Sequence, residues 1–165
     1  MSKKKGWIVP AALGVLVLIL ILIFCLPVRQ PKFFDGARHV AVSMSEWTID
    51  YDTPKTLRTE AMMKAGDPAM DELTAIFRDY RLFRTFQFLD TLDGATTFTG
   101  NYDTPDFFIG VLTEGTTVHN IRLMSGYLHY ENKLWRIGRN NSDWAELAQR
   151  LKDFVLEHSE DEITN

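Results

Sequence analysis

The longest apolar run of the chain occupies positions 7–26, where no charged residue interrupts a series rich in Leu, Ile and Val. A helix of this length rises about 30 Å, which matches the hydrocarbon core of a bilayer. Pro10 falls in the first turn, where a missing amide proton costs little, and Trp7 stands where an interfacial aromatic residue anchors a helix end. The pattern predicts a single transmembrane helix over residues 7–27, with the lipid bilayer as its partner.

The charges before this run predict its orientation. Lys3, Lys4 and Lys5 precede it, so the positive-inside rule places a tail of residues 1–6 in the cytoplasm and the rest of the chain outside a cell membrane. A cleaved signal peptide is the weaker alternative, because the run exceeds a signal-peptide core and no pair of small residues marks a cleavage site. Cys25, near the outer end, leaves acylation open as a minor alternative.

Polar and apolar positions alternate once the apolar run has ended. Two prolines, a glycine and mixed charge first predict a short stalk over residues 28–37. The alternation then changes phase near residue 45, which predicts a strand broken by a bulge, or two short strands. Its apolar members are Val40, Val42, Met44, Trp47, Ile49 and Tyr51. Residues 56–65 fit either a helical turn or a strand.

Two segments have helical periodicity. In the first, Asp67 is placed as the N-cap, Pro68 as the first helical residue, and an apolar stripe runs from Met70 to Tyr80. In the second, Ser142 or Asp143 offers a cap and Glu146 completes a capping box on Asp143. Its stripe consists of Trp144, Leu147, Leu151, Phe154 and Val155. Both segments are predicted to be amphipathic helices.

Strand patterns fill the region between these helices. Segments 82–89, 96–102 and 107–112 are rich in Phe, Thr and other strand formers and are separated by turn residues. In segment 117–137, Ser125-Gly126 and Asn132-Lys133 are read as two hairpin turns. This register puts Leu123 opposite Leu128, Ile121 opposite Tyr130, and Tyr130 opposite Trp135. It also sets Arg122, His129 and Arg136 side by side on the other face, with Glu131 near them.

Together these elements predict the α+β class. An extracytoplasmic domain over residues 38–158 would hold an antiparallel meander sheet with both helices on one face, followed by an acidic tail over residues 159–165. The other sheet face would be left for solvent or a partner. The segment Tyr127–Ile137, an aromatic strand, a polar turn and a second aromatic strand before the last helix, resembles that of uncharacterised small exported bacterial domains. The resemblance covers about the last third of the chain and implies no activity.

Composition narrows the classes of function. The chain has a formal net charge of -4, and without the three N-terminal lysines the remainder carries -7, which argues against nucleic-acid binding. Cys25 is the single cysteine, so the outer domain has neither disulfides nor thiolate chemistry. An exported domain without disulfides favours a bacterial cell envelope, with an envelope or membrane protein as its partner.

Candidate chemistry is sparse. Arg122, His129 and Arg136 form the candidate ligand-binding site, because neighbouring like charges on a sheet favour a bound anion. The histidines show no metal-ligand spacing, and no cofactor motif or catalytic constellation is found, so no metal, cofactor or catalytic residue is expected. The sequence favours a membrane-anchored, non-catalytic binding or interaction module for a protein partner or an anionic small ligand. A membrane-anchored envelope hydrolase, centred on a carboxylate or on Ser125, is the alternative, and the oligomeric state is open.

Overall fold

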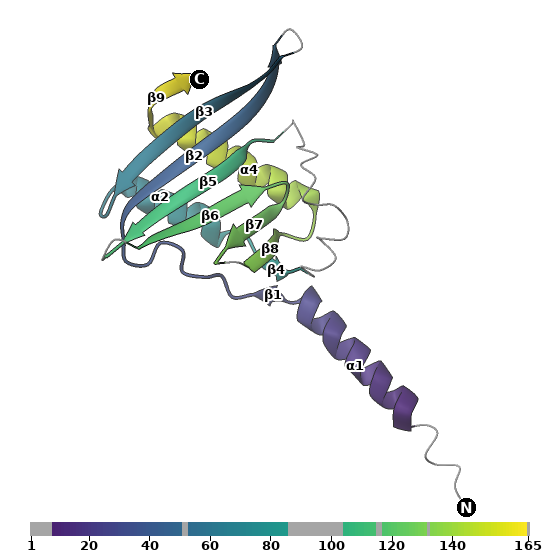
Figure 1. The fold of residues 1–165 in the computed structure, drawn as a ribbon. Helices are drawn as coiled ribbons and strands as arrows, with labels where there is room; N and C mark the ends of the chain where they lie inside the picture. The colour runs from purple at the N-terminus through teal and green to yellow at the C-terminus, as the bar shows by residue number, and fades with distance from the viewer. Residues whose placement is uncertain (1–7, 51–52, 86–103, 115–116, 132, 165) are drawn as a thin grey trace, which may run out of the picture.

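The computed structural model describes residues 8–50, 53–85, 104–114, 117–131 and 133–164. The chain folds, in order, into α1 (Ile8–Cys25), β1 (Pro27–Val28), β2 (Ala37–Asp50), β3 (Thr53–Lys64), α2 (Pro68–Arg78), β4 (Leu82–Arg84), β5 (Asp106–Thr113), β6 (Val118–Met124), β7 (Tyr127–Tyr130), β8 (Lys133–Ile137), α4 (Asn141–His158) and β9 (Ser159–Thr164) (Figure 1). Helix α1 projects away from the other elements, which form a sheet with α2 and α4 behind it.

The transmembrane helix predicted over residues 7–27 is wrong. Among the described residues, no helix combines the length and the apolar character needed to cross a membrane. Helix α1 has 18 residues, which corresponds to a rise of about 27 Å, less than the roughly 30 Å of a hydrocarbon core. It ends at Cys25 because the chain then turns into β1, where Pro27 pairs with Phe83 and Val28 with Leu82 of β4.

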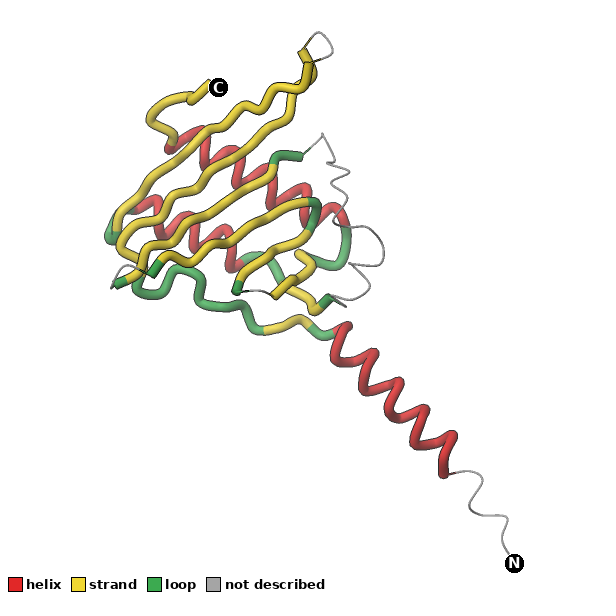
Figure 2. Tube along the Cα trace, viewed as in Figure 1, coloured by secondary structure: helices red, strands yellow, loops and turns green. Residues whose placement is uncertain are grey.

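The sheet forms one layer and the helices α2 and α4 form the second (Figure 2). Within the described residues its strands lie in the order β1-β4-β8-β7-β6-β5-β2-β3-β9, and every pairing is antiparallel. The predicted α+β class is therefore confirmed. The core lies between the layers, where Phe107, Ile121 and Leu123 of the sheet and Leu151 and Phe154 of α4 are almost fully buried.

Strands β2 and β3 form a long hairpin. Their pairing runs without interruption from His39 opposite Lys64 to Asp50 opposite Thr53, so the predicted break in the first strand is wrong. The irregularity lies instead between Ala37 and His39, where β2 meets β5. Residues 56–65, which fitted helix or strand, lie almost wholly in β3 because their burial alternates with the period of two that a sheet facing one core requires.

The two amphipathic helices are confirmed, with one corrected cap. The Asp67 side chain accepts a hydrogen bond from the Ala69 amide at 3.0 Å at the start of α2. Helix α4 begins earlier than predicted, with Asn140 rather than Ser142 or Asp143 as N-cap. The Asp143 carboxylate still serves the helix start, because it accepts from the backbone amides of Arg139 at 2.7 Å and Asn140 at 3.4 Å.

The remaining strand predictions have different outcomes. The strand expected at 107–112 is confirmed as β5. Of segment 82–89 the structure shows β4, in which Leu82 and Phe83 are both buried, whereas residues 86–89 and the strand expected at 96–102 lie outside the described residues.

Residues 28–37, predicted as a stalk, lie against the domain. Phe33 is 5% exposed, and its ring makes edge contacts with Phe77 of α2 and Tyr130 of β7 at centroid distances of 5.5 and 5.3 Å. At the other end of the chain, the predicted acidic tail contributes β9, which pairs with β3. Both segments therefore extend the sheet and core beyond the predicted boundaries.

Candidate functional site

Among the described residues, no helix covers the face of the sheet opposite α2 and α4, which is called the open face below (Figure 1). Side chains that alternate with the buried ones point to this face, and several are large and apolar. Met62 of β3 is 71% exposed, Phe108 of β5 45% and Val118 of β6 56%. Exposed apolar side chains among charged ones are typical of a surface that contacts a partner.

The first hairpin of the predicted meander is confirmed. Arg122 of β6 lies opposite His129 of β7, and both side chains are exposed on the open face. The turn between the strands consists of Ser125 and Gly126, with φ of 49° and 86°. Positive φ at both positions is the requirement of the two-residue turn that suits the twist of a β-hairpin. The turn therefore explains why Ser125 and Gly126 stand together, a pair in which Ser125 had also been considered as the centre of a hydrolase.

The second hairpin has a different register from the predicted one. Tyr130 lies opposite Lys133 rather than Trp135, and Arg136 lies opposite Tyr127 rather than His129. The slip is two residues, so Arg136 stays on the open face but lies diagonally from His129. Glu131, predicted to lie near these cations, instead lies 4.0 Å from His119.

Asp106 provides a negative group near Arg122. It lies at the start of β5 and is half-buried, and burial raises the pKa of its carboxyl, while the nearby charge of Arg122 acts in the opposite direction. Because the folded chain then holds this proton more tightly than the unfolded chain, the carboxyl lowers stability as pH rises through its raised pKa. Arg122 Nη2 also lies 3.9 Å from Met124 Sδ.

Arg136 is held by an aromatic contact. Its guanidinium carbon lies 5.7 Å from the centre of the Phe83 ring, and that of Arg139 lies 5.8 Å from the same ring. A guanidinium over an aromatic face is attracted to the ring and keeps its N–H donors for other partners. On the open face, Arg122 and His129 are therefore direct cross-strand neighbours, and Arg136 lies diagonally from His129 on the next strand.

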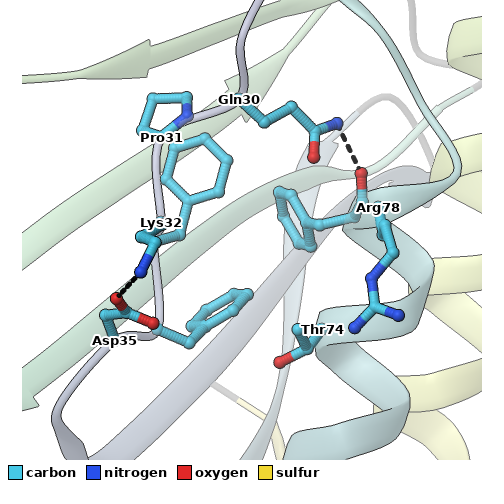
Figure 3. Close-up of a pocket in the computed structure, with 9 residues that line it drawn as sticks. Gln30, Pro31, Lys32, Asp35, Thr74 and Arg78 are labelled. Carbon is cyan, nitrogen blue, oxygen red and sulfur yellow. Dashed lines mark hydrogen bonds and ion pairs between the residues drawn. The ribbon is translucent and has the colours of Figure 1, made fainter.

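A small pocket of about 270 Å³ lies between residues 30–35 and the end of α2 (Figure 3). The amide nitrogen of Gln30 donates to the carbonyl oxygen of Phe77 at 2.7 Å and also to that of Tyr80. Lys32 forms an ion pair with Asp35 at 2.7 Å. The Gln30 bonds hold this segment to the end of α2, where the Phe77 carbonyl also accepts from the backbone amide of Tyr80. The Lys32–Asp35 pair lies within the segment itself.

A cluster that the sequence did not indicate lies on the helix layer. Glu72 of α2 and Glu157 and His158 of α4 place one potential ligand atom each within 4.8 Å of one another. Glu72 and His158 are 86 positions apart in the chain, so no spacing rule connects them. The expected absence of a metal site rested on the spacing of the histidines along the chain. Spacing does not show that a carboxylate from another helix could join His158.

Comparison with family models, with curated proteins and with solved structures found no match for this chain.

Proposed function

We propose that the protein is a non-catalytic binding module that is held at a membrane through α1 and binds an anionic group on the open face of its sheet. The observation that carries the binding proposal is the placement of Arg122, His129 and Arg136 on the one face that neither α2 nor α4 covers. Guanidinium groups bind carboxylates and phosphates through paired N–H donors. A partner's acidic side chains or a small anion would meet the same groups.

The rest of this face carries charges of both signs. Arg58 and Lys64 of β3 belong to the exposed set, and Arg58 donates to Ser43 Oγ at 2.9 Å. The chain as a whole is acidic, with a net charge of -4. Glu60 lies on the same face between Arg58 and Lys64, so the local positive potential that attracts anions comes chiefly from Arg122 and Arg136.

Helix α1 supports association with a membrane. Its exposed residues include Leu13, Leu16 and Leu18 at 63%, 54% and 58%, and the helix contains no acidic or basic residue. Apolar residues occur all round it, which is typical of a helix in an apolar surrounding. Because the side chains of residues 10–23 are all exposed, we propose lipid as the surrounding of α1.

The anion site is tested by calorimetric titration of the full chain with pyrophosphate and, separately, with a glutamate-rich peptide. The double variant Arg122→Gln with Arg136→Gln is expected to bind at least about a hundredfold more weakly, since each lost charge-assisted hydrogen bond contributes about 1.5–3 kcal/mol and every 1.4 kcal/mol is tenfold in affinity. The control is Arg78→Gln on α2, which makes the same kind of substitution once, away from the open face. Equal binding by the double variant and the wild type would rule out this site.

Membrane association is tested by flotation with phosphatidylcholine vesicles. The wild-type chain is expected to float, whereas Leu16→Asp with Leu20→Asp is expected to stay in the dense fraction, because charged side chains on the apolar surface of α1 oppose its contact with lipid. Met62→Asp, which places a charge on the open sheet face, serves as the control. Loss of flotation in the Met62 variant alone would assign lipid contact to the sheet instead.

A further inference from the structure

We propose that Glu72, Glu157 and His158 form a binding site for a divalent transition-metal ion, with Zn²⁺ as the test ion, and that the ion joins α2 to α4. The site lies on the helix layer, on the opposite side of the sheet from the open face. It is therefore independent of the anion site proposed above.

The packing of the two helices brings these residues together. Glu72 Oε2 lies 3.2 Å from His158 Nε2, and two turns further on, at the C-cap of α2, the Asp79 carboxylate lies 2.8 Å from Arg150 Nη1. Seven residues forward in α2 correspond to eight residues back in α4, which is the register of antiparallel helices lying side by side. The start of α2 is thereby fixed against the end of α4.

The distances suit a tetrahedral metal. Zn–N and Zn–O bonds of 2.0–2.2 Å at tetrahedral angles leave neighbouring ligand atoms about 3.4 Å apart. The Glu72–His158 distance of 3.2 Å is already close to that value, and all three ligand atoms lie within 4.8 Å of one another. Rotation of the Glu157 side chain would complete three protein ligands, with water as the fourth.

Electrostatics at this position favour a cation. Two carboxylates within this distance repel each other, and the last turn of α4 adds the partial negative charge of unpaired carbonyl groups. The His158 ring also packs against Phe154 at a centroid distance of 4.7 Å, which limits its orientations. One imidazole nitrogen with two carboxylates suits a transition-metal ion, whereas Mg²⁺ and Ca²⁺ prefer oxygen ligands throughout.

The experiment is a calorimetric titration of the full chain with Zn²⁺, repeated with Mg²⁺. We expect one Zn²⁺ ion per chain, no binding of Mg²⁺ at the same concentrations, and a rise in melting temperature with Zn²⁺ because the ion binds the folded chain. Glu157→Gln is the decisive variant, since it leaves the Glu72–His158 pair intact. It is expected to weaken Zn²⁺ binding by about tenfold or more, a loss that even an outer-shell partner can cause.

His119→Asn is the matched control, because His119 lies 4.0 Å from Glu131 in a histidine–carboxylate pair to which the described part of the chain adds no third ligand. This variant should bind Zn²⁺ like the wild type. Unchanged affinity in Glu157→Gln, or affinity lost in His119→Asn instead, would overturn the proposal and leave Glu72 and His158 as an ion pair only. Absence of Zn²⁺ binding to the wild-type chain would overturn it as well. Both changed side chains are at least partly exposed, so the variants are expected to fold.

Discussion

Replacing Phe33 by alanine is expected to lower the free energy of unfolding by about 3–5 kcal/mol, the usual cost of removing a buried phenylalanine. The ring is 5% exposed and contacts both Phe77 of α2 and Tyr130 of β7. Alanine would leave a cavity between residues 28–37 and the two layers of the domain. Urea unfolding of the full chain in mild detergent, followed by tryptophan fluorescence, measures the change.

Phe108→Ala is the control for this prediction. It removes the same ring from a position that is 45% exposed on the open sheet face, where little cavity forms. Its cost is expected to stay within about 1 kcal/mol. If the two variants were equally stable, residues 28–37 would not be part of the folded core, and the segment would behave as the stalk that its prolines and charges suggested.

Gly138→Ala is expected to destabilise the chain by about 2–4 kcal/mol, combining left-handed backbone strain with damage to a helix cap. Gly138 has φ of +66°, and a Cβ at this position would overlap the side chain of Asp143. That carboxylate accepts the Arg139 amide at the start of α4, so it cannot move without losing its hydrogen bond. Thermal unfolding of the full chain measures the loss.

Gly36→Ala separates backbone strain from damage to the helix cap, the two expected causes of the Gly138→Ala destabilisation. Gly36 has nearly the same φ, +68°, but a Cβ there would meet no atom within 4 Å. It should therefore cost only the backbone strain, about 1–2 kcal/mol. The double variant Gly138→Ala with Asp143→Ala should cost less than the sum of its two single changes, because the overlap is gone. Strict additivity would contradict the proposed clash.

Local chemistry accounts for the elements that the sequence predicted well. Asp67 and Pro68 mark the start of α2 because a cap and a proline act within one turn of the chain. The first hairpin was predictable because a two-residue turn at Ser125 and Gly126 sets the register of both adjoining strands. None of these features depends on distant residues.

The error in the second hairpin has a physical cause. A slip of two residues returns every side chain to the same face, so alternation of polar and apolar residues does not distinguish the two registers. In the structure Trp135 lies opposite Leu128, and Leu128 is 1% exposed. The candidate site was thus predicted with the right face and the wrong neighbour for Arg136.

The end of α1 also depends on distant residues. The apolar run continues to Leu26, but β1 pairs with β4, which lies more than fifty positions further along the chain. The apolar pattern alone did not show that pairing, and the predicted transmembrane helix was consequently too long. The burial of Phe33, which placed the predicted stalk against the domain, has the same origin.

The sequence by itself determined the α+β class, the two amphipathic helices and the open face on which Arg122 and His129 lie, because caps, turns and periodicity act over a few residues. Only the tertiary structure decided the length of α1, the register of β8 and the meeting of Glu72 with His158. Each of these depends on contacts between segments whose relative positions are set by packing, which spacing along the chain does not encode.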